Sequence, residues 1–200
     1  NIWPTILPKF KPSFKSLGQL IYKVALMVLK ECDKILPIKF IEKLFSNTVS
    51  TKGRLLHYYG EETGSESWCG WHLDHGFFTG LVAAQYYNVK TGEVSAKPTN
   101  GGLKIRSRTG KLISVAIPDD AIAFQIGESA QILSGGFLRA TPHFVQKPIM
   151  DTPKDRVTLA LFIDCPFNTK MVLPEYALSD ALETYHLPKG IQLLKKRFCT

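Results

Sequence analysis

Long apolar runs are absent from this sequence of 200 residues. The longest, residues 24–29, is far shorter than the roughly 20 apolar residues that a membrane-spanning helix needs. The chain also begins without the charged region, apolar stretch and cleavage site of a signal peptide. We therefore expect no transmembrane segment and a cytoplasmic location. Because the first residue is Asn1 rather than Met, we also expect a fragment or a processed product, so a targeting segment could be missing.

Cysteine is scarce, and its placement is irregular. The four cysteines form no CxxC pair, which in a chain of this size indicates reduced thiols rather than a disulfide framework. Cys69 lies beside a cluster of His and Asp residues, but between Trp68 and Trp71 we favour a packed thiol over a metal ligand. The contents of 44% hydrophobic and 21% charged residues exclude a chain that is wholly disordered, collagenous or coiled coil.

Acidic residues are few at the N-terminal end. Residues 1–54 contain ten Lys or Arg against three Asp or Glu, which accounts for most of the net charge of +8. Such an arm could bind nucleic acid or an anionic surface. Because neither a zinc-finger spacing nor an aromatic RNA-binding signature accompanies it, we do not expect nucleic acid and place the lysines on the solvent face of a helix.

The first 50 residues predict an arm with two helices. Three prolines make the start irregular, and a long amphipathic helix is expected at about 14–35, followed by a shorter one at 38–45. We expect the apolar face of the long helix to pack on a β-core, with a membrane surface as the alternative. Its apolar positions recur every three or four residues: Leu17, Leu20, Ile21, Val24, Ala25, Val28 and Leu29.

From Lys52 onward, short β-rich runs alternate with turn signals. This spacing favours a sandwich, barrel or jelly roll over a parallel α/β sheet. The tail from Pro174 is expected to be mostly helical. Seven strands are predicted: 55–59, 80–87, 103–106, 111–116, 121–126, 137–140 and 157–164.

His72 and Asp74 are the first candidate metal ligands. In an extended strand, residues i and i+2 face the same way, so an imidazole and a carboxylate would lie side by side. His143, just after the predicted strand 137–140, is the best candidate for a third ligand. Two histidines and one carboxylate make the facial triad of non-haem Fe(II) oxygenases. By itself the His-x-Asp pair is weak evidence, since a structural pair would look the same.

Arg156 and Thr158 form a second candidate pair, also on one face of a strand. A guanidinium with a hydroxyl beside it can hold a carboxylate. The alternative is a surface ion-pair residue at the start of a strand.

In this order the motifs resemble the 2-oxoglutarate- and Fe(II)-dependent dioxygenases, in particular the isopenicillin N synthase-like branch. The resemblance extends from about Asn1 to about Phe167. The motifs are the aromatic strand 55–59, His72-x-Asp74-x-Gly76 with Thr79, the turn at Gly127-Glu128-Ser129, His143, and Arg156-x-Thr158.

The resemblance implies a fold, a ligand set and cofactors. The fold would be mainly β with flanking helices (α+β): an arm at 1–50, a double-stranded β-helix or jelly roll at 51–170, and a helical tail at 171–200. His72, Asp74 and His143 would bind Fe(II), with His72 preferred over the adjacent His75. The cosubstrate 2-oxoglutarate would be held by Arg156 and Thr158, with the Tyr59 hydroxyl added. No catalytic residue is implied beyond the metal ligands.

The implied activity is oxidation of a C–H bond in a small molecule by O₂, with release of succinate and CO₂. One alternative is an iron oxidase that works without 2-oxoglutarate, in which Arg156 and Thr158 hold the substrate's own carboxylate. Another is a non-catalytic jelly-roll binding protein with a relic metal site. The substrate and the oligomeric state are not evident from the sequence.

Overall fold

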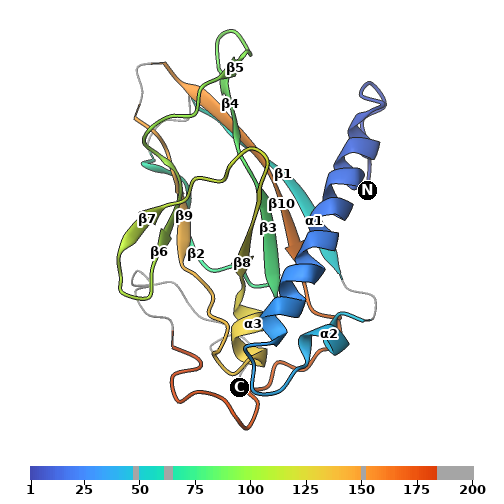
Figure 1. Cartoon of the computed structure of the whole chain (residues 1–200). Coiled ribbons are helices and arrows are strands. Elements are labelled where there is room, and N and C mark those ends of the chain that lie inside the picture. The colour runs from blue at the N-terminus through green and yellow to red at the C-terminus, as the bar shows by residue number, and fades with distance from the viewer. Residues whose placement is uncertain (47–49, 61–64, 150–151, 184–200) are drawn as a thin grey trace.

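A computed structural model describes residues 1–46, 50–60, 65–149 and 152–183. Three helices and ten strands lie within these ranges (Figure 1). The helices are α1 (Phe10–Asp33), α2 (Ile41–Leu44) and α3 (Glu128–Leu133). The strands are β1 (Thr51–Tyr58), β2 (Ser67–His72), β3 (Phe78–Val82), β4 (Gln85–Asn88), β5 (Val94–Ser95), β6 (Gly102–Arg106), β7 (Leu112–Ser114), β8 (Ile122–Ile126), β9 (His143–Gln146) and β10 (Lys154–Ile163).

The strands form two antiparallel sheets, which confirms the predicted jelly roll. The larger sheet runs β5-β4-β10-β3-β8, with β1 paired along the other edge of β10, and the smaller runs β2-β9-β6-β7. The long strand β10 pairs first with β4 and then with β3, so it organises the larger sheet. The smaller sheet faces the larger one (Figure 1). The site lies between them.

Helix α1 covers the outer face of the larger sheet, as its periodicity predicts (Figure 1). Ile21, Ala25 and Leu29 are fully or almost fully buried against the sheet. The prediction for Leu20 is wrong: its side chain is 52% exposed, because the buried stripe follows the i, i+4 row of Ile21. Gly80 on β3 permits the close contact, since a Cβ there would overlap Cγ2 of Ile21.

Two of the predicted strands differ from the structure. The run 80–87 is two strands, β3 and β4, which pair with different parts of β10. Residues 137–140 are not a strand, because side chains from the end of α3 take their backbone amides: Ser134 Oγ accepts from Leu138 N, and Gln131 Oε1 from Ala140 N.

The predicted helical tail is also wrong where it is described. Residues 171–183 form turns that pack beside α3, with Gln131 Nε2 donating to the carbonyl of Ala181 at 3.0 Å. The rest of that prediction, 184–200, lies outside the described residues. Within the described ranges, none of the helices is both long and apolar enough to cross a membrane.

Candidate metal and cosubstrate site

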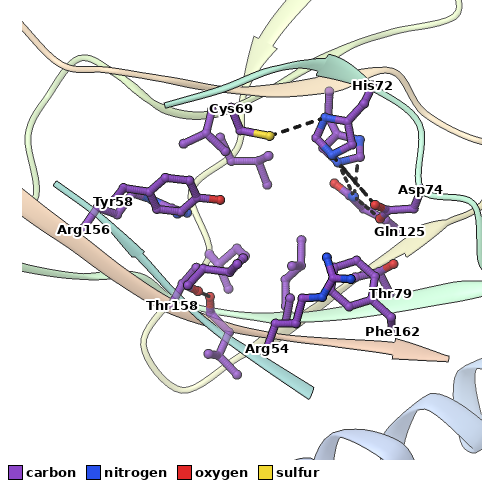
Figure 2. Close-up of a pocket in the computed structure, with 18 residues that line it drawn as sticks. Arg54, Tyr58, Cys69, His72, Asp74, Thr79, Gln125, Arg156, Thr158 and Phe162 are labelled. Atoms are coloured by element: carbon purple, nitrogen blue, oxygen red, sulfur yellow. Dashed lines mark hydrogen bonds and ion pairs between the residues drawn. The ribbon is translucent and has the colours of Figure 1, made fainter. Parts of the chain in front are cut away.

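A cavity of about 160 Å³ opens between the two sheets (Figure 2). Both sheets contribute, so the cavity is the interior of the jelly roll. Its lining combines eight apolar side chains with ten polar or titratable ones: Arg54, Tyr58, Cys69, His72, Asp74, Thr79, Gln125, His143, Arg156 and Thr158.

The structure brings His72, Asp74 and His143 together at one side of this cavity. His72 ends β2, His143 begins β9, and the two are paired across the sheet. Oδ1 of Asp74 lies 3.9 Å from Nε2 of His72 and 3.8 Å from Nε2 of His143. One ligand atom from each residue lies within 4.8 Å of the others. Two segments far apart in the sequence, 72–74 and the start of β9, thus place three groups around a common point.

Backbone carbonyls orient both imidazole rings. Nδ1 of His72 is 2.8 Å from the carbonyl oxygen of Gly70, and Nδ1 of His143 is 3.0 Å from that of Thr141. Each Nδ1 therefore donates its proton to the backbone, and each Nε2 is the atom directed at Asp74. This is how proteins commonly fix the tautomer of a metal-binding histidine.

The two histidines differ in their proton affinity. Burial alone would lower the pKa of His72, but contacts with the Cys69 side chain and the Gly70 carbonyl, together with the Asp74 charge, raise it to about 9. Burial and the neighbouring His72 lower the pKa of His143. The surroundings therefore favour the protonated form more strongly at His72 than at His143.

Gln125 on β8 completes the surroundings of Asp74. Its Nε2 donates to Oδ2 of Asp74 at 3.1 Å, which leaves Oδ1 to face the histidines. The sequence analysis missed this residue, although a lone polar side chain in the run Ile-Ala-Phe-Gln-Ile is a usable signal. The arrangement favours single-oxygen coordination by the carboxylate.

Backbone hydrogen bonds from the start of α3 hold the segment that carries Asp74 in place. Glu128 N donates to the carbonyl of Asp74 at 2.8 Å, and Ser129 N to that of Gly76 at 3.2 Å. A Cβ at Gly127 would overlap the Gly76 carbonyl oxygen, so the two backbones touch at a point where only glycine fits. His75 points away from the cavity to Glu128, at 2.5 Å.

The three side chains fit a divalent metal ion. Nitrogen and oxygen ligands bind such ions at about 2.0–2.3 Å, so atoms that share an ion lie within about 4.6 Å of each other. The distances of 3.8 and 3.9 Å satisfy this limit. With two imidazoles and one carboxylate as its protein ligands, such an ion would keep coordination positions for further ligands.

Arg156 and Thr158 line the same cavity from β10, as their spacing predicts. Arg156 is 7% exposed, and its Nε and Nη1 have no hydrogen-bond partner among the described residues. Its guanidinium carbon lies 5.2 Å from the centre of the Tyr58 ring. Thr158 donates through Oγ1 to the carbonyl of Val82 at 3.0 Å.

The cavity tyrosine is Tyr58, one residue before the predicted one. On β1 the side chains of Arg54, Leu56 and Tyr58 face the cavity, and the Tyr58 hydroxyl points into it (Figure 2). Tyr59 is 59% exposed and its ring lies 4.2 Å from that of His57. Two adjacent tyrosines left the strand register ambiguous, and the alternation of β1 selects the first. Burial raises the pKa of Tyr58, against the lowering effect of Arg156.

Residues 53–164, more than half of the chain, match the family model of the 2OG-Fe(II) oxygenase superfamily. No curated protein sequence matches the chain. Among solved structures, a full-length Neurospora crassa protein in complex with alpha-KG is similar over 100% of this chain and 61% of its own, with TM-score 0.69 and 20% identity. A putative 2OG-Fe(II) oxygenase family protein from Caulobacter crescentus gives TM-score 0.69 and 20% identity over 96% and 58% of the two chains.

The protein JOX2, in complex with 2OG, Fe and JA, is similar over 92% of this chain and 49% of its own, with TM-score 0.66 and 19% identity. The chain thus spans roughly half to three fifths of the length of these proteins. At this low sequence identity, the structural similarity establishes the fold alone. The narrower isopenicillin N synthase-like branch stays a prediction. With the family match over β1 to β10 and the triad at its centre, the chain belongs to the 2OG-Fe(II) oxygenase superfamily.

Proposed function

We propose that this protein is an Fe(II)- and 2-oxoglutarate-dependent oxygenase that oxidises a C–H bond of a small molecule and releases succinate and CO₂. His72, Asp74 and His143 bind the metal. Arg156, Thr158 and Tyr58 bind the distal carboxylate of 2-oxoglutarate, with Tyr58 in the role expected for Tyr59. The size of the cavity, about 160 Å³, supports a small substrate.

The buried guanidinium of Arg156 is the observation that carries this proposal. A charged group at 7% exposure is costly unless an anion accompanies it, and among the described residues the only carboxylate that lines the cavity is Asp74. The two unpartnered nitrogens of Arg156 are donors available to a carboxylate. A dicarboxylate that reaches from the triad to Arg156 would satisfy both ends of the cavity.

The iron, when bound, supplies the activation of O₂ and the oxidising power. The chain's own residues bind and orient the metal and the cosubstrate. The Thr141 and Gly70 carbonyls hold the imidazole rings, and Gln125 holds the second oxygen of Asp74. The Thr158 hydroxyl can rotate from the Val82 carbonyl toward a carboxylate oxygen. The apolar remainder of the lining excludes water from the reacting groups.

Binding followed by product analysis tests the proposal. Under anaerobic conditions, titration calorimetry should show one Mn(II) per chain, and 2-oxoglutarate should bind only to the metal-loaded protein. After addition of Fe(II) and O₂, succinate should form. Weak or absent Mn(II) binding would support a relic site. Metal binding without 2-oxoglutarate binding would support the oxidase alternative.

The variants Arg156→Lys and Arg54→Lys form a matched pair, since both arginines line the cavity. Lysine keeps the charge but loses the planar fork, so Arg156→Lys should weaken 2-oxoglutarate binding by about one to two decades. Mn(II) affinity should stay the same, because Arg156 is not a ligand. Arg54→Lys should leave 2-oxoglutarate affinity unchanged. Equal losses in both variants would contradict the assignment.

A further inference from the structure

Arg54 is a second cationic group in the cavity, and the proposed chemistry leaves it without a role. It lies on β1, on the same face as Leu56 and Tyr58, and it is solvent-exposed while still lining the cavity. It therefore belongs to the rim. In Figure 2, Arg54 and Tyr58 approach the cavity from different sides, and His72 and Asp74 lie at a third side.

The guanidinium of Arg54 is held in place but not neutralised. Its central carbon lies 5.1 Å from the centre of the Phe162 ring, where a cation–π contact stabilises it. Within the described parts of the chain, the cation–π contact is its recorded interaction, and its side chain makes no ion pair and no hydrogen bond to protein. A guanidinium stacked on a ring keeps its N–H groups free along its edge, which is the geometry for a flat anion.

We propose that Arg54 binds a carboxylate of the substrate, so that the substrates of this protein are small organic acids. That the bound acid is oxidised rests on the proposed function, whereas the binding of its carboxylate by Arg54 does not. Arg156 lies deep and buried, whereas Arg54 lies at the exposed rim. The deep arginine suits a cosubstrate enclosed by the sheets, and the rim arginine suits a substrate that enters last.

Paired probes test the charge at Arg54 directly. Phenylacetate, 3-phenylpropionate and 4-phenylbutyrate are compared with their neutral amides, by titration of the full chain loaded with Mn(II) and 2-oxoglutarate. The best acid should bind about tenfold or more tightly than its amide, the usual value of a charge-assisted contact. Arg54→Gln should reduce this preference to about twofold, and Arg54→Lys should keep part of it.

The variant Arg156→Met, tested without 2-oxoglutarate, separates this inference from the proposed function. If the acid preference persists in Arg156→Met and disappears in Arg54→Gln, it belongs to Arg54 whether or not the protein uses 2-oxoglutarate. Because Arg54 is exposed, about 0.5 M salt should shrink the preference. Equal binding of acids and amides by the unaltered protein, or an unchanged preference in Arg54→Gln, would overturn the proposal. Unfolding curves identical to the unaltered protein control for folding.

Discussion

The two faces of the larger sheet are built from the same strands but have different roles: one packs against α1 and the other lines the cavity. On β10, Leu159, Leu161 and Ile163 point to α1 and are at most 5% exposed. The residues that alternate with this face along the strand point into the cavity, and Arg156 and Thr158 are among them. One face satisfies its side chains by packing, whereas the other leaves buried nitrogens without partners among the described residues. Stability and binding should therefore respond to substitutions on different faces of one strand.

The largest expected effect is on the packed face. Ile163→Ala should lower the free energy of unfolding by about 2–5 kcal/mol, because Ile163 is fully buried in the core and a cavity would remain. Mn(II) affinity per folded molecule should not change. Chemical denaturation and calorimetry measure the two quantities. The control Leu56→Ala, on the cavity face, should cost only about 1 kcal/mol, and an equal cost would remove the contrast.

On the cavity face, Arg156→Met should show the reverse pattern. The affinity for 2-oxoglutarate should fall by about ten- to a hundredfold, since the charge-assisted bonds are lost. The free energy of unfolding without ligand should stay the same or rise by about 1 kcal/mol, because a buried charge without an anion is removed. A marked loss of stability would show that Arg156 is a structural residue.

Gly80→Ala tests the contact that joins the packed face to α1. The new methyl group would overlap Cγ2 of Ile21 and lie 3.1 Å from the Phe124 ring, so α1 must shift. We expect a loss of about 1–3 kcal/mol in the free energy of unfolding. Gly70→Ala is the matched control, since no atom lies within 4 Å of its added methyl group, and it should change stability by less than about 0.5 kcal/mol.

The smallest expected effect of a substitution is the shift that Cys69→Ala causes in the pH dependence of metal binding. The pKa of His72 is raised to about 9, so below that pH a metal ion must displace its proton. Mn(II) affinity should rise with pH, by up to about tenfold per unit, and level off near pH 9. Calorimetry at a series of pH values measures this. In Cys69→Ala, which removes one raising contact, the levelling should come at lower pH.

Much of the fold follows from periodicity, because α1 and the strands around the cavity have regular patterns of apolar residues. The triad residues were also predicted, although β2 ends at His72 and Asp74 lies beyond it, so hydrogen bonds to α3 rather than strand alternation place the carboxylate. Sequence reasoning failed where hydrogen bonds between side chains and backbone decide the local structure. At 137–140 the backbone binds Ser134 and Gln131, and in the tail at 171–183 it binds Gln131 from a distant part of the sequence. It placed the tyrosine one residue late, because only pairing with β10 fixes which of two adjacent rings faces inward.

The close contact between Gly127 and Gly76 has a consequence for how this protein can diversify. The aspartate ligand is anchored through backbone hydrogen bonds to α3, on elements that do not carry Arg54 or Leu56. Substitutions at the rim therefore leave that anchor undisturbed, while almost any side chain at Gly127 displaces it. A library aimed at new substrates should randomise Arg54 and Leu56 and keep Tyr58 and the Gly76–Gly127 junction fixed. Substrate preference can then evolve separately from metal binding.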